Sequence, residues 1–252
     1  MKALVSPVVL VTLAACAASQ KPQQDATQKP TPQQIVAAAD RTEKDRALDP
    51  HRKPVEMLAF FGPAPGMRVA DLGAGGGYST ELFARAVAPG GTVLAQDPPA
   101  WDGPGLQRVW SARLARPAMQ NTTHVLRQWD EPLPPELTDL DAVYAVAAYH
   151  DAVAEKGDTN KMNGAVFRAL KPGGVYAIID NSARAGSGAA DCERLHRVDE
   201  QLVREEVTRA GFRLAAEGDF LRNPADARDW NADPSENKTH TQDRFALKFV
   251  KP

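Results

Sequence analysis

The part of this chain that most constrains its fold is residues 67–78, where a short apolar run leads through a cluster of glycines into a helical pattern. Residues 69–72 predict a buried strand, and residues 79–87 predict a helix. The turn between them contains Gly73, Gly75, Gly76 and Gly77. Glycine allows a sharp turn and lets a ligand touch the backbone amides. The segment therefore predicts either a ligand-binding turn or only a tight corner between a strand and a helix.

Asp71, just before the first glycine, indicates which ligand such a turn would accept. A carboxylate at this place repels the diphosphate of a dinucleotide, whereas it pairs with the ammonium group of an amino-acid ligand. The segment resembles the first motif of the class I S-adenosylmethionine-dependent methyltransferases, in which an acid and one further residue precede Gly-x-Gly-x-Gly. The resemblance implies that S-adenosylmethionine is the cofactor. Asp71 also disfavours the alternative of a nicotinamide-dependent dehydrogenase.

The remaining sequence alternates strand and helix patterns. Further strands are predicted at residues 92–96, 123–127, 140–147, 175–179, 212–217 and 244–250. Helices are predicted at residues 34–48, 55–61, 106–115, 160–170 and 192–210. The apolar run 140–147 suits a central parallel strand that is buried on both faces. This order predicts an α/β fold: a doubly wound, Rossmann-like, mostly parallel seven-stranded sheet with an antiparallel edge strand.

A second motif supports the resemblance. Residues 170–174, Leu-Lys-Pro-Gly-Gly, precede an apolar strand as the corresponding turn does in the methyltransferases, although such a turn ends helices in many folds. The resemblance covers roughly residues 57–252. Shorter segments are similar to a small group of predicted bacterial methyltransferases, some of them exported, whose substrate is unassigned; they are residues 58–62, 149–151, 195–200 and 244–249.

The cofactor contacts are expected after the first three strands, because ligands of open α/β sheets lie beyond the carboxyl ends of the strands. The resemblance implies that Asp71 faces the methionine ammonium group. Asp97, at the end of the second strand, is expected to bind the ribose hydroxyls, with a plain turn aspartate as the alternative. Asp130 follows the third strand, where the family contacts adenine. The full set of expected contacts is Asp71, Gly73, Ala74, Gly75, Gly77, Tyr78, Asp97, Trp129 and Asp130.

Trp129 and Asp130 each allow a second interpretation. Trp129 is placed to stack on the adenine base, but a buried tryptophan of the core fits equally well. Asp130 is equally consistent with a solvated loop acid.

The catalytic candidates are Tyr149, His150 and Asp151, which follow the fourth strand. His150 is the favoured general base because a histidine titrates near neutral pH, and a purely structural histidine is the alternative. Asp180 and Asn181 end the fifth strand, and together with Asp151 they resemble the oxygen ligands of divalent-cation-dependent O-methyltransferases. We expect no metal, because carboxylates at strand ends are common. His196, Asp199 and Glu200 are expected on one solvated helix face.

The first 34 residues predict export and a lipid anchor. Residues 1–15 have one lysine and a short apolar run that is typical of a secretory signal. Leu-Ala-Ala before Cys16 resembles a lipoprotein cleavage site, with lipid on Cys16; an ordinary signal or a fortuitous apolar start is the alternative. Residues 16–34 are expected to form a disordered linker. Ala17 suggests, by resemblance, the outer membrane facing the periplasm, whereas the chain stays in the cytoplasm if the signal interpretation is wrong.

The composition limits the remaining functions. Residues 35–252 suit one domain, and 43% hydrophobic residues suffice for a core. A net charge of −2 with dispersed bases argues against a nucleic-acid partner. We therefore expect a methyltransferase for a small-molecule acceptor, in an unknown oligomeric state. Because the cofactor is made in the cytosol, an exported, non-catalytic lipoprotein that binds a nucleoside-like ligand is the alternative.

Overall fold

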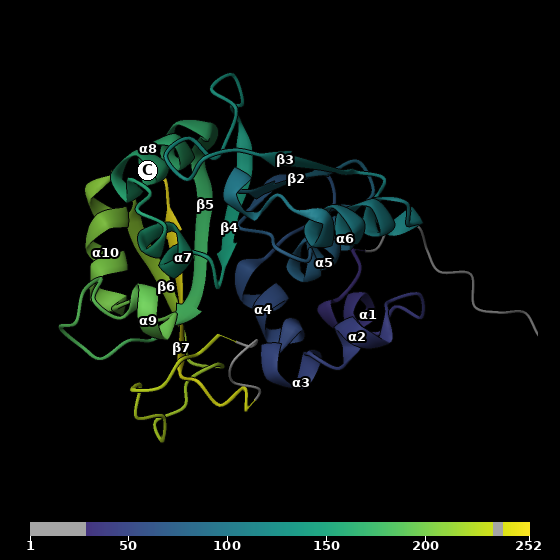
Figure 1. Cartoon of the computed structure of the whole chain (residues 1–252). Coiled ribbons are helices and arrows are strands. Elements are labelled where there is room, and N and C mark those ends of the chain that lie inside the picture. Colours follow the sequence, from purple (N-terminus) through teal and green to yellow (C-terminus); the bar gives the residue numbers. More distant parts are fainter. Residues whose placement is uncertain (1–28, 234–238) are drawn as a thin grey trace, which may run out of the picture.

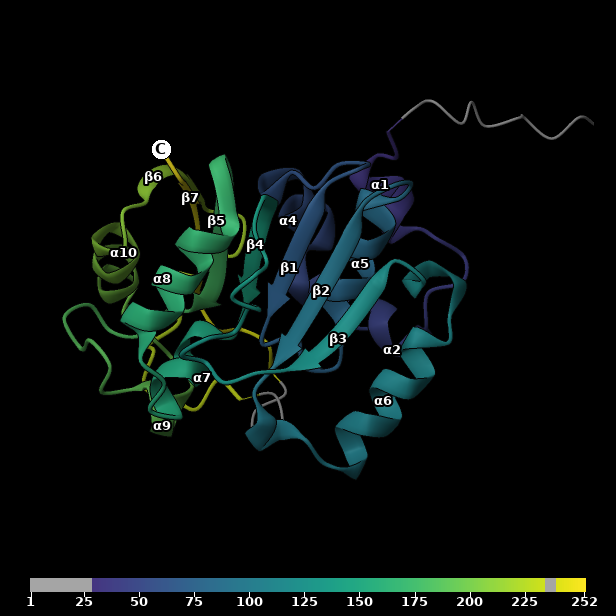
Figure 2. The same ribbon diagram turned by 90° about the horizontal axis from the view of Figure 1, so that it is seen from above.

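The computed structural model describes residues 29–233 and 239–252. Within them, a seven-stranded sheet has the order β3-β2-β1-β4-β5-β7-β6 (Figures 1 and 2). The strands are Arg68–Leu72 (β1), Thr92–Asp97 (β2), Thr122–Leu126 (β3), Leu140–Val146 (β4), Leu170–Asn181 (β5), Arg213–Gly218 (β6) and Arg244–Val250 (β7). β7 runs antiparallel to its neighbours β5 and β6, and the other pairs are parallel. The predicted α/β fold with a mostly parallel sheet and an antiparallel strand near one edge is confirmed.

Helices cover both faces of the sheet (Figure 2). The helices are Pro32–Val36 (α1), Glu43–Arg46 (α2), Asp49–Arg52 (α3), Pro54–Phe61 (α4), Tyr78–Val87 (α5), Pro104–Leu114 (α6), Tyr149–Ala154 (α7), Thr159–Ala169 (α8), Cys192–Leu195 (α9) and Glu200–Arg209 (α10). Two short 3₁₀ turns lie at Pro99–Trp101 (η1) and Pro117–Met119 (η2).

The alternation of side chains along β4 shows how one sheet supports two cores. Val143 and Ala145 pack with the apolar residues of α8 and α10, whereas Ala142 and Tyr144 pack with those of α4 and α5. All four side chains are nearly or fully buried. Successive side chains of a strand point to opposite faces, so a continuous apolar run fills both layers. This confirms the expectation that residues 140–147 form a central strand.

Three helix predictions were wrong in detail, each for a local reason. Residues 34–48 form α1 and α2 with a turn between them, because Thr42 caps a new helix by accepting from the amide of Asp45 at 3.0 Å. Residues 49–54, between two predicted helices, contain a further helix, α3. Residues 192–210 are also split, since His196 adopts φ +50° and ends α9. His196, Asp199 and Glu200 therefore do not share a helix face.

A helix begins within the segment that was predicted to be a linker. α1 starts at Pro32, and the side chains of Thr31 and Gln34 cap its first turn reciprocally. Residues 31–34 thus belong to the domain and not to the linker. Within the described ranges, every helix is too short or too polar to cross a bilayer. Residues 1–28, which include Cys16 and the predicted signal, lie outside the described residues.

Candidate functional site

A cavity of about 850 Å³ opens at the carboxyl ends of the central strands. The glycine turn after β1, the residues after β4, the end of β5 and the start of β7 contribute to its wall, and α2, α3 and α6 cover it. Of the residues predicted to bind or catalyse, those that line it are Gly73, Ala74, Gly75, Tyr78, His150 and Asp151. Those that do not are Asp71, Gly77, Asp97, Trp129, Asp130 and Tyr149. The structure therefore brings about half of the predicted set to one cavity.

At the glycine turn, the cavity is bounded by Cα atoms without side chains, because most of the backbone amides already donate within the protein. The amides of Gly73 and Ala74 donate to the side chain and the carbonyl of Gln96, at 3.3 and 3.0 Å, and that of Gly75 donates to Asp97 at 2.7 Å. Gly75 has φ +54°, and a Cβ placed there would meet no atom within 4 Å. A glycine with open space in front of it lets a ligand approach the backbone closely.

Gly73 and Gly77 are glycines for packing reasons. A Cβ on Gly73 would lie 2.5 Å from the Cβ of Ala148, and one on Gly77 would lie 2.7 Å from the side chain of Arg113. Both have positive φ angles, +60° and +72°. Their side-chain positions are thus occupied by the protein itself, and in particular Gly77 makes room for α6, not for a ligand.

Asp71 lies beneath the turn with one oxygen unused. Its Oδ2 accepts from Thr80 Oγ1 at 2.6 Å and from Ser79 Oγ at 3.0 Å, while its Oδ1 is buried without a hydrogen-bond partner among the described residues. Burial raises the pKa of Asp71 to about 7, although the two hydroxyls oppose this and Asp97 adds to it. A buried acceptor without a partner is costly unless water or a ligand supplies a donor. Asp71 thus holds the start of α5 and keeps one acceptor free.

Asp97 is fully buried and has protein partners on both oxygens. Oδ1 accepts from the amide of Gly75, and Oδ2 is 3.1 Å from Trp110 Nε1 and 2.9 Å from His124 Nε2. Trp110 stacks on His124 at 4.1 Å between ring centroids. A ribose could reach this carboxylate only by sharing or displacing one of these donors. In the structure Asp97 ties the glycine turn to β2 and β3.

Trp129 and Asp130 do not themselves line the cavity, although Trp129 donates at 2.8 Å to Glu155, which does. Trp129 is 3% exposed and packs under Gly73, so the core interpretation describes its place. Asp130 is half exposed and accepts from the amide of Asp158 at 2.7 Å, which lowers its pKa. Trp101 lines the cavity together with the predicted Tyr78, and sequence reasoning missed it. The signal that could have identified it is its position four residues after the end of β2.

His150 is held between two carboxylates. Its Nδ1 lies 2.6 Å from Asp180 Oδ1, its Nε2 lies 3.3 Å from Asp151 Oδ1, and its backbone amide donates to Asp180 at 3.0 Å. Burial alone lowers the pKa of His150, but Asp180 and Asp151 outweigh burial and raise the pKa from 6.5 to about 10. The imidazole is therefore protonated at neutral pH. His150 was predicted to be the general base because a histidine titrates near neutral pH, and the raised pKa contradicts that reason.

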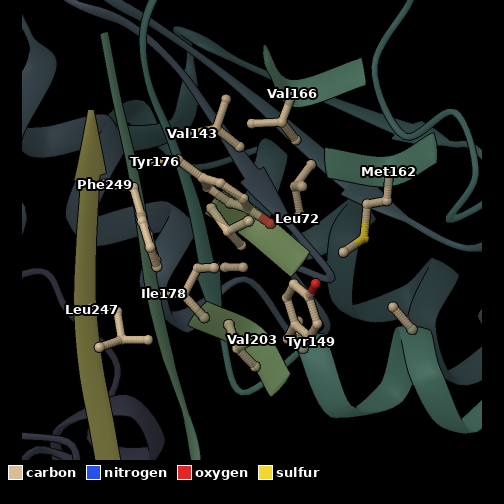
Figure 3. Packing of buried hydrophobic residues seen from close by; sticks show 14 of the residues in the cluster. Leu72, Val143, Tyr149, Met162, Val166, Tyr176, Ile178, Val203, Leu247 and Phe249 are labelled. Atoms are coloured by element: carbon tan, nitrogen blue, oxygen red, sulfur yellow. The ribbon is translucent and has the colours of Figure 1, made fainter. Parts of the chain in front are cut away.

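Tyr149 points into the core on the other side of α7. Its ring is 1% exposed and lies among the apolar side chains of the α8 and α10 layer, near Tyr176 and Val203 (Figure 3). Its hydroxyl donates to Glu206 at 2.7 Å and accepts from Asn163 at 2.8 Å. Burial and Glu206 raise its pKa well above 10. This placement argues against the predicted catalytic role, because Tyr149 cannot touch a ligand in the cavity.

The N-terminal helices are fastened over the cavity by buried ion pairs. Glu81, which is 1% exposed, pairs with Arg113 at 2.7 Å, and Arg113 also pairs with Asp45 of α2 at 3.0 Å. Tyr78 donates to Asp49 of α3 at 2.7 Å, and Asp49 pairs with Arg41. These contacts connect α2, α3 and α6 to the first turn of α5. They are long-range pairs that local sequence patterns do not reveal.

Of the oxygen ligands considered for a divalent cation, Asp180 and Asp151 contact His150, whereas Asn181 Oδ1 is buried without a partner among the described residues. Asp180 accepts from His150 and from the amide of Asn181 at 2.7 Å. In the described ranges, no group of three or more His, Cys, Asp or Glu side chains is arranged to hold a metal ion.

Comparison with known proteins places the fold in one class. No family model matches the chain. It resembles an uncharacterized methyltransferase of Synechocystis sp., with 30% identity over 130 residues, which is 52% of this chain and 53% of that protein. A solved S-adenosylmethionine-dependent methyltransferase from Aquifex aeolicus superposes with a TM-score of 0.58 and 18% identity, over 88% of this chain and 98% of the other.

A third comparison agrees. A structure described as a putative sarcosine dimethylglycine methyltransferase from Galdieria sulphuraria gives a TM-score of 0.59 and 18% identity, over 82% of this chain and 87% of the other. The chain therefore has the fold of S-adenosylmethionine-dependent methyltransferases. The sequence match spans about half the length of the Synechocystis relative, so activity is taken up below as a proposal.

Proposed function

We propose that this protein is an S-adenosylmethionine-dependent methyltransferase that acts on a small-molecule acceptor. The observation that carries the proposal is the glycine turn after β1, which forms one wall of the cavity while His150 and Asp151 form another. The cavity volume of about 850 Å³ falls within the range of small-molecule sites. The unpaired, buried Oδ1 of Asp71 supplies the acceptor that an ammonium-bearing ligand needs nearby. The comparisons give no support to the alternative of a non-catalytic binding protein.

When bound, S-adenosylmethionine supplies a methyl group from its sulfonium and leaves as the neutral thioether. The residues of this chain would act mainly by positioning, since an in-line methyl transfer depends on the alignment of donor and acceptor. Asp151 lines the cavity and replaces His150 as the group that receives a proton from a hydroxyl or amine acceptor. His150, protonated and fixed by Asp180, would orient that carboxylate and spread the positive charge. An acceptor that is already anionic would need no base.

The first test is ligand binding to the full chain. We expect calorimetry to show binding of S-adenosylmethionine and S-adenosylhomocysteine but not of NAD. Asp71→Asn should weaken both sulfur ligands by about 10- to 150-fold, the range for loss of a charge-assisted hydrogen bond. Asp219→Asn, a change at an exposed aspartate, should leave both affinities unchanged. Absence of binding by the folded wild-type protein would refute the proposal.

The second proposal under this heading concerns location. We propose that the chain is exported and carries lipid on Cys16, on the argument from residues 1–16 alone. Mass spectrometry of the mature protein should show a lipidated N-terminal Cys16, and Cys16→Ser should abolish both lipid and membrane association. Cys192 offers the matched control, because it is buried in the fold and its replacement by Ser should leave the lipid in place. Recovery of the wild-type protein with residues 1–15 intact would overturn export and remove the conflict with a cytosolic cofactor.

A further inference from the structure

Two arginines in the cavity wall have no carboxylate partner. Arg244, the first residue of β7, is 8% exposed; its guanidinium donates to the carbonyl of His51, and its Nε has no partner. Arg52, the last residue of α3, has its guanidinium carbon 4.5 Å from the centre of the Tyr78 ring. In residues 29–233 and 239–252, neither arginine forms an ion pair. Arg113, in the same wall, pairs with two carboxylates.

The carboxylates near these two arginines are already paired with other cations. Asp49 pairs with Arg41, Asp45 with Arg113, Asp243 with Arg222 and Arg228, and Asp180 with His150. Each of these acids attracts Arg52 or Arg244 from a distance but gives neither of them a direct contact. Among residues 29–233 and 239–252, the two guanidinium groups therefore have no carboxylate in direct contact.

Burial makes this arrangement costly. Burial lowers the pKa of Arg244 to about 10, and the nearby positive charge of Arg52 lowers it further. Burial likewise lowers the pKa of Arg52. Both side chains remain charged at neutral pH, and a buried charge without a partner destabilises a fold. An anionic ligand that binds between the guanidinium groups of Arg52 and Arg244 would offset this cost.

The surroundings of the pair are also positive. The imidazoles of His51 and His240 stack at 4.4 Å between centroids beside the arginines. Burial lowers the pKa of His240, and so do the charges of His51, Arg52 and Arg244. Burial is the largest of these causes, and the contributions of the three cations add to it because like charges disfavour the protonated imidazole. An anionic group would be drawn to this end of the cavity.

Arg244 lies next to the candidate catalytic residues, whereas Arg52 lies over Tyr78, the residue that follows the glycine turn. Arg244 pairs in register with Asn181 on the neighbouring strand β5, and Asn181 directly follows Asp180 in the sequence. Asn181 lines the cavity, and its side-chain oxygen is buried without a partner. The glycine turn follows β1, on the far side of β4 from β5. Arg244 is therefore on the acceptor side of the cavity, and Arg52 reaches towards it from α3.

We propose that Arg52 and Arg244 form an oxyanion-binding site that holds a carboxylate or phosphate group of the methyl acceptor. Guanidinium groups bind both groups through paired hydrogen bonds, and two of them converging from different elements would fix the orientation of the acceptor. The assignment to the acceptor rests on the proposed function. The carboxylate of the cofactor has the same chemistry, so the experiment below separates the two sources.

Inorganic sulfate is the probe for the site itself. Titration of the full chain with sulfate at constant ionic strength should raise its melting temperature, whereas chloride should not. Arg52→Gln and Arg244→Gln should each abolish the response, and Arg108→Gln, on the exposed face of α6, should retain it. Arg244→Gln removes an unpaired buried charge, so in chloride it should melt no lower than wild type. Wild-type protein that does not respond to sulfate, or variants that respond like wild type, would overturn the site.

If Arg244→Gln does not fold, Arg52→Gln tests the same site from a half-buried position on another element. The source of the anion is tested with S-adenosylhomocysteine and with 5′-methylthioadenosine, which lacks the amino-acid carboxylate. For an acceptor site, saturating S-adenosylhomocysteine should leave the sulfate response intact, and the glutamine variants should change its affinity by less than about twofold.

Two other outcomes are informative. If S-adenosylhomocysteine competes with sulfate and the glutamine variants weaken it by about tenfold or more without affecting 5′-methylthioadenosine, the site holds the cofactor and the assignment to the acceptor is wrong. If sulfate binds but neither adenosyl ligand does, the proposed function fails, the assignment to a methyl acceptor falls with it, and the anion site alone stands.

Discussion

Replacing Asp180 by alanine is expected to destabilise the fold by about 3–5 kcal/mol, the cost of removing one partner from a buried ion pair. Asp180 is fully buried. It accepts from the backbone amide and the ring Nδ1 of His150 and from the backbone amide of Asn181. Without it, a protonated imidazole stays buried with only Asp151 nearby. Urea denaturation should show a lower midpoint with an unchanged slope.

The matched control is Asp219→Ala, because Asp219 is exposed. Its effect should stay within about 0.5 kcal/mol, as is usual for surface substitutions. If Asp180→Ala lowers the free energy of unfolding no more than Asp219→Ala does, the Asp180–His150 pair contributes no stability.

The same pair makes stability depend on pH in a defined direction. Because the carboxylates raise the pKa of His150 from 6.5 to about 10, the stabilisation is fully present below pH 6.5 and is lost as the pH rises towards 10. The difference in unfolding free energy between wild type and Asp180→Ala should therefore shrink over this interval. A difference that is constant from pH 6 to pH 10 would show that His150 is neutral in the folded protein.

Gly75→Ala is expected to weaken binding of S-adenosylhomocysteine by about tenfold or more while the fold is largely kept. The new methyl group would meet no protein atom, but it would occupy the space in front of the turn that the ligand needs. The positive φ of Gly75 costs about 1–2 kcal/mol for a residue with a side chain. Calorimetry gives the affinity, and thermal unfolding gives the stability.

Two other glycines serve as comparisons for this experiment. Gly73→Ala should unfold much more easily than Gly75→Ala, because its Cβ would overlap Ala148 and Trp129, at 2.5 and 2.8 Å. Gly164→Ala, in the middle of α8 with open space around it, should stabilise the protein by up to about 1 kcal/mol without changing affinity. If Gly75→Ala binds S-adenosylhomocysteine like wild type, the ligand does not approach this turn.

Residues near the ends of strands were the most predictable part of the site. Gly75, His150 and Asp151 line the cavity because each follows a strand whose carboxyl end lies at the same edge of the sheet. The direction of a side chain was less predictable. Tyr149 and His150 are adjacent in sequence, but α7 begins there and turns the tyrosine into the core and the histidine towards the cavity.

The protonation state of His150 was not predictable from its sequence neighbours. Asp151 is adjacent in the chain, but Asp180 comes from the next strand, 30 residues later, and has the larger effect on the pKa of His150. The helix break at His196 was missed for a similar reason, since the apolar spacing of residues 192–210 continues through it. A periodic pattern reports which face is apolar and not whether the backbone is continuous.

Local patterns of residues were enough to predict the fold class, the glycine turn after β1 and the strand ends that form the cavity. These follow from short-range patterns, because the alternation of apolar runs, glycine turns and helices records what each segment must bury. The tertiary structure alone decided which charges meet. Arg52 and Arg244 come from opposite ends of the described chain. Among the described residues, the acids that attract them are paired with other cations, which only the tertiary structure shows. Which charged side chains meet over long range depends on tertiary packing, and the spacing of residues within one segment does not reveal that packing.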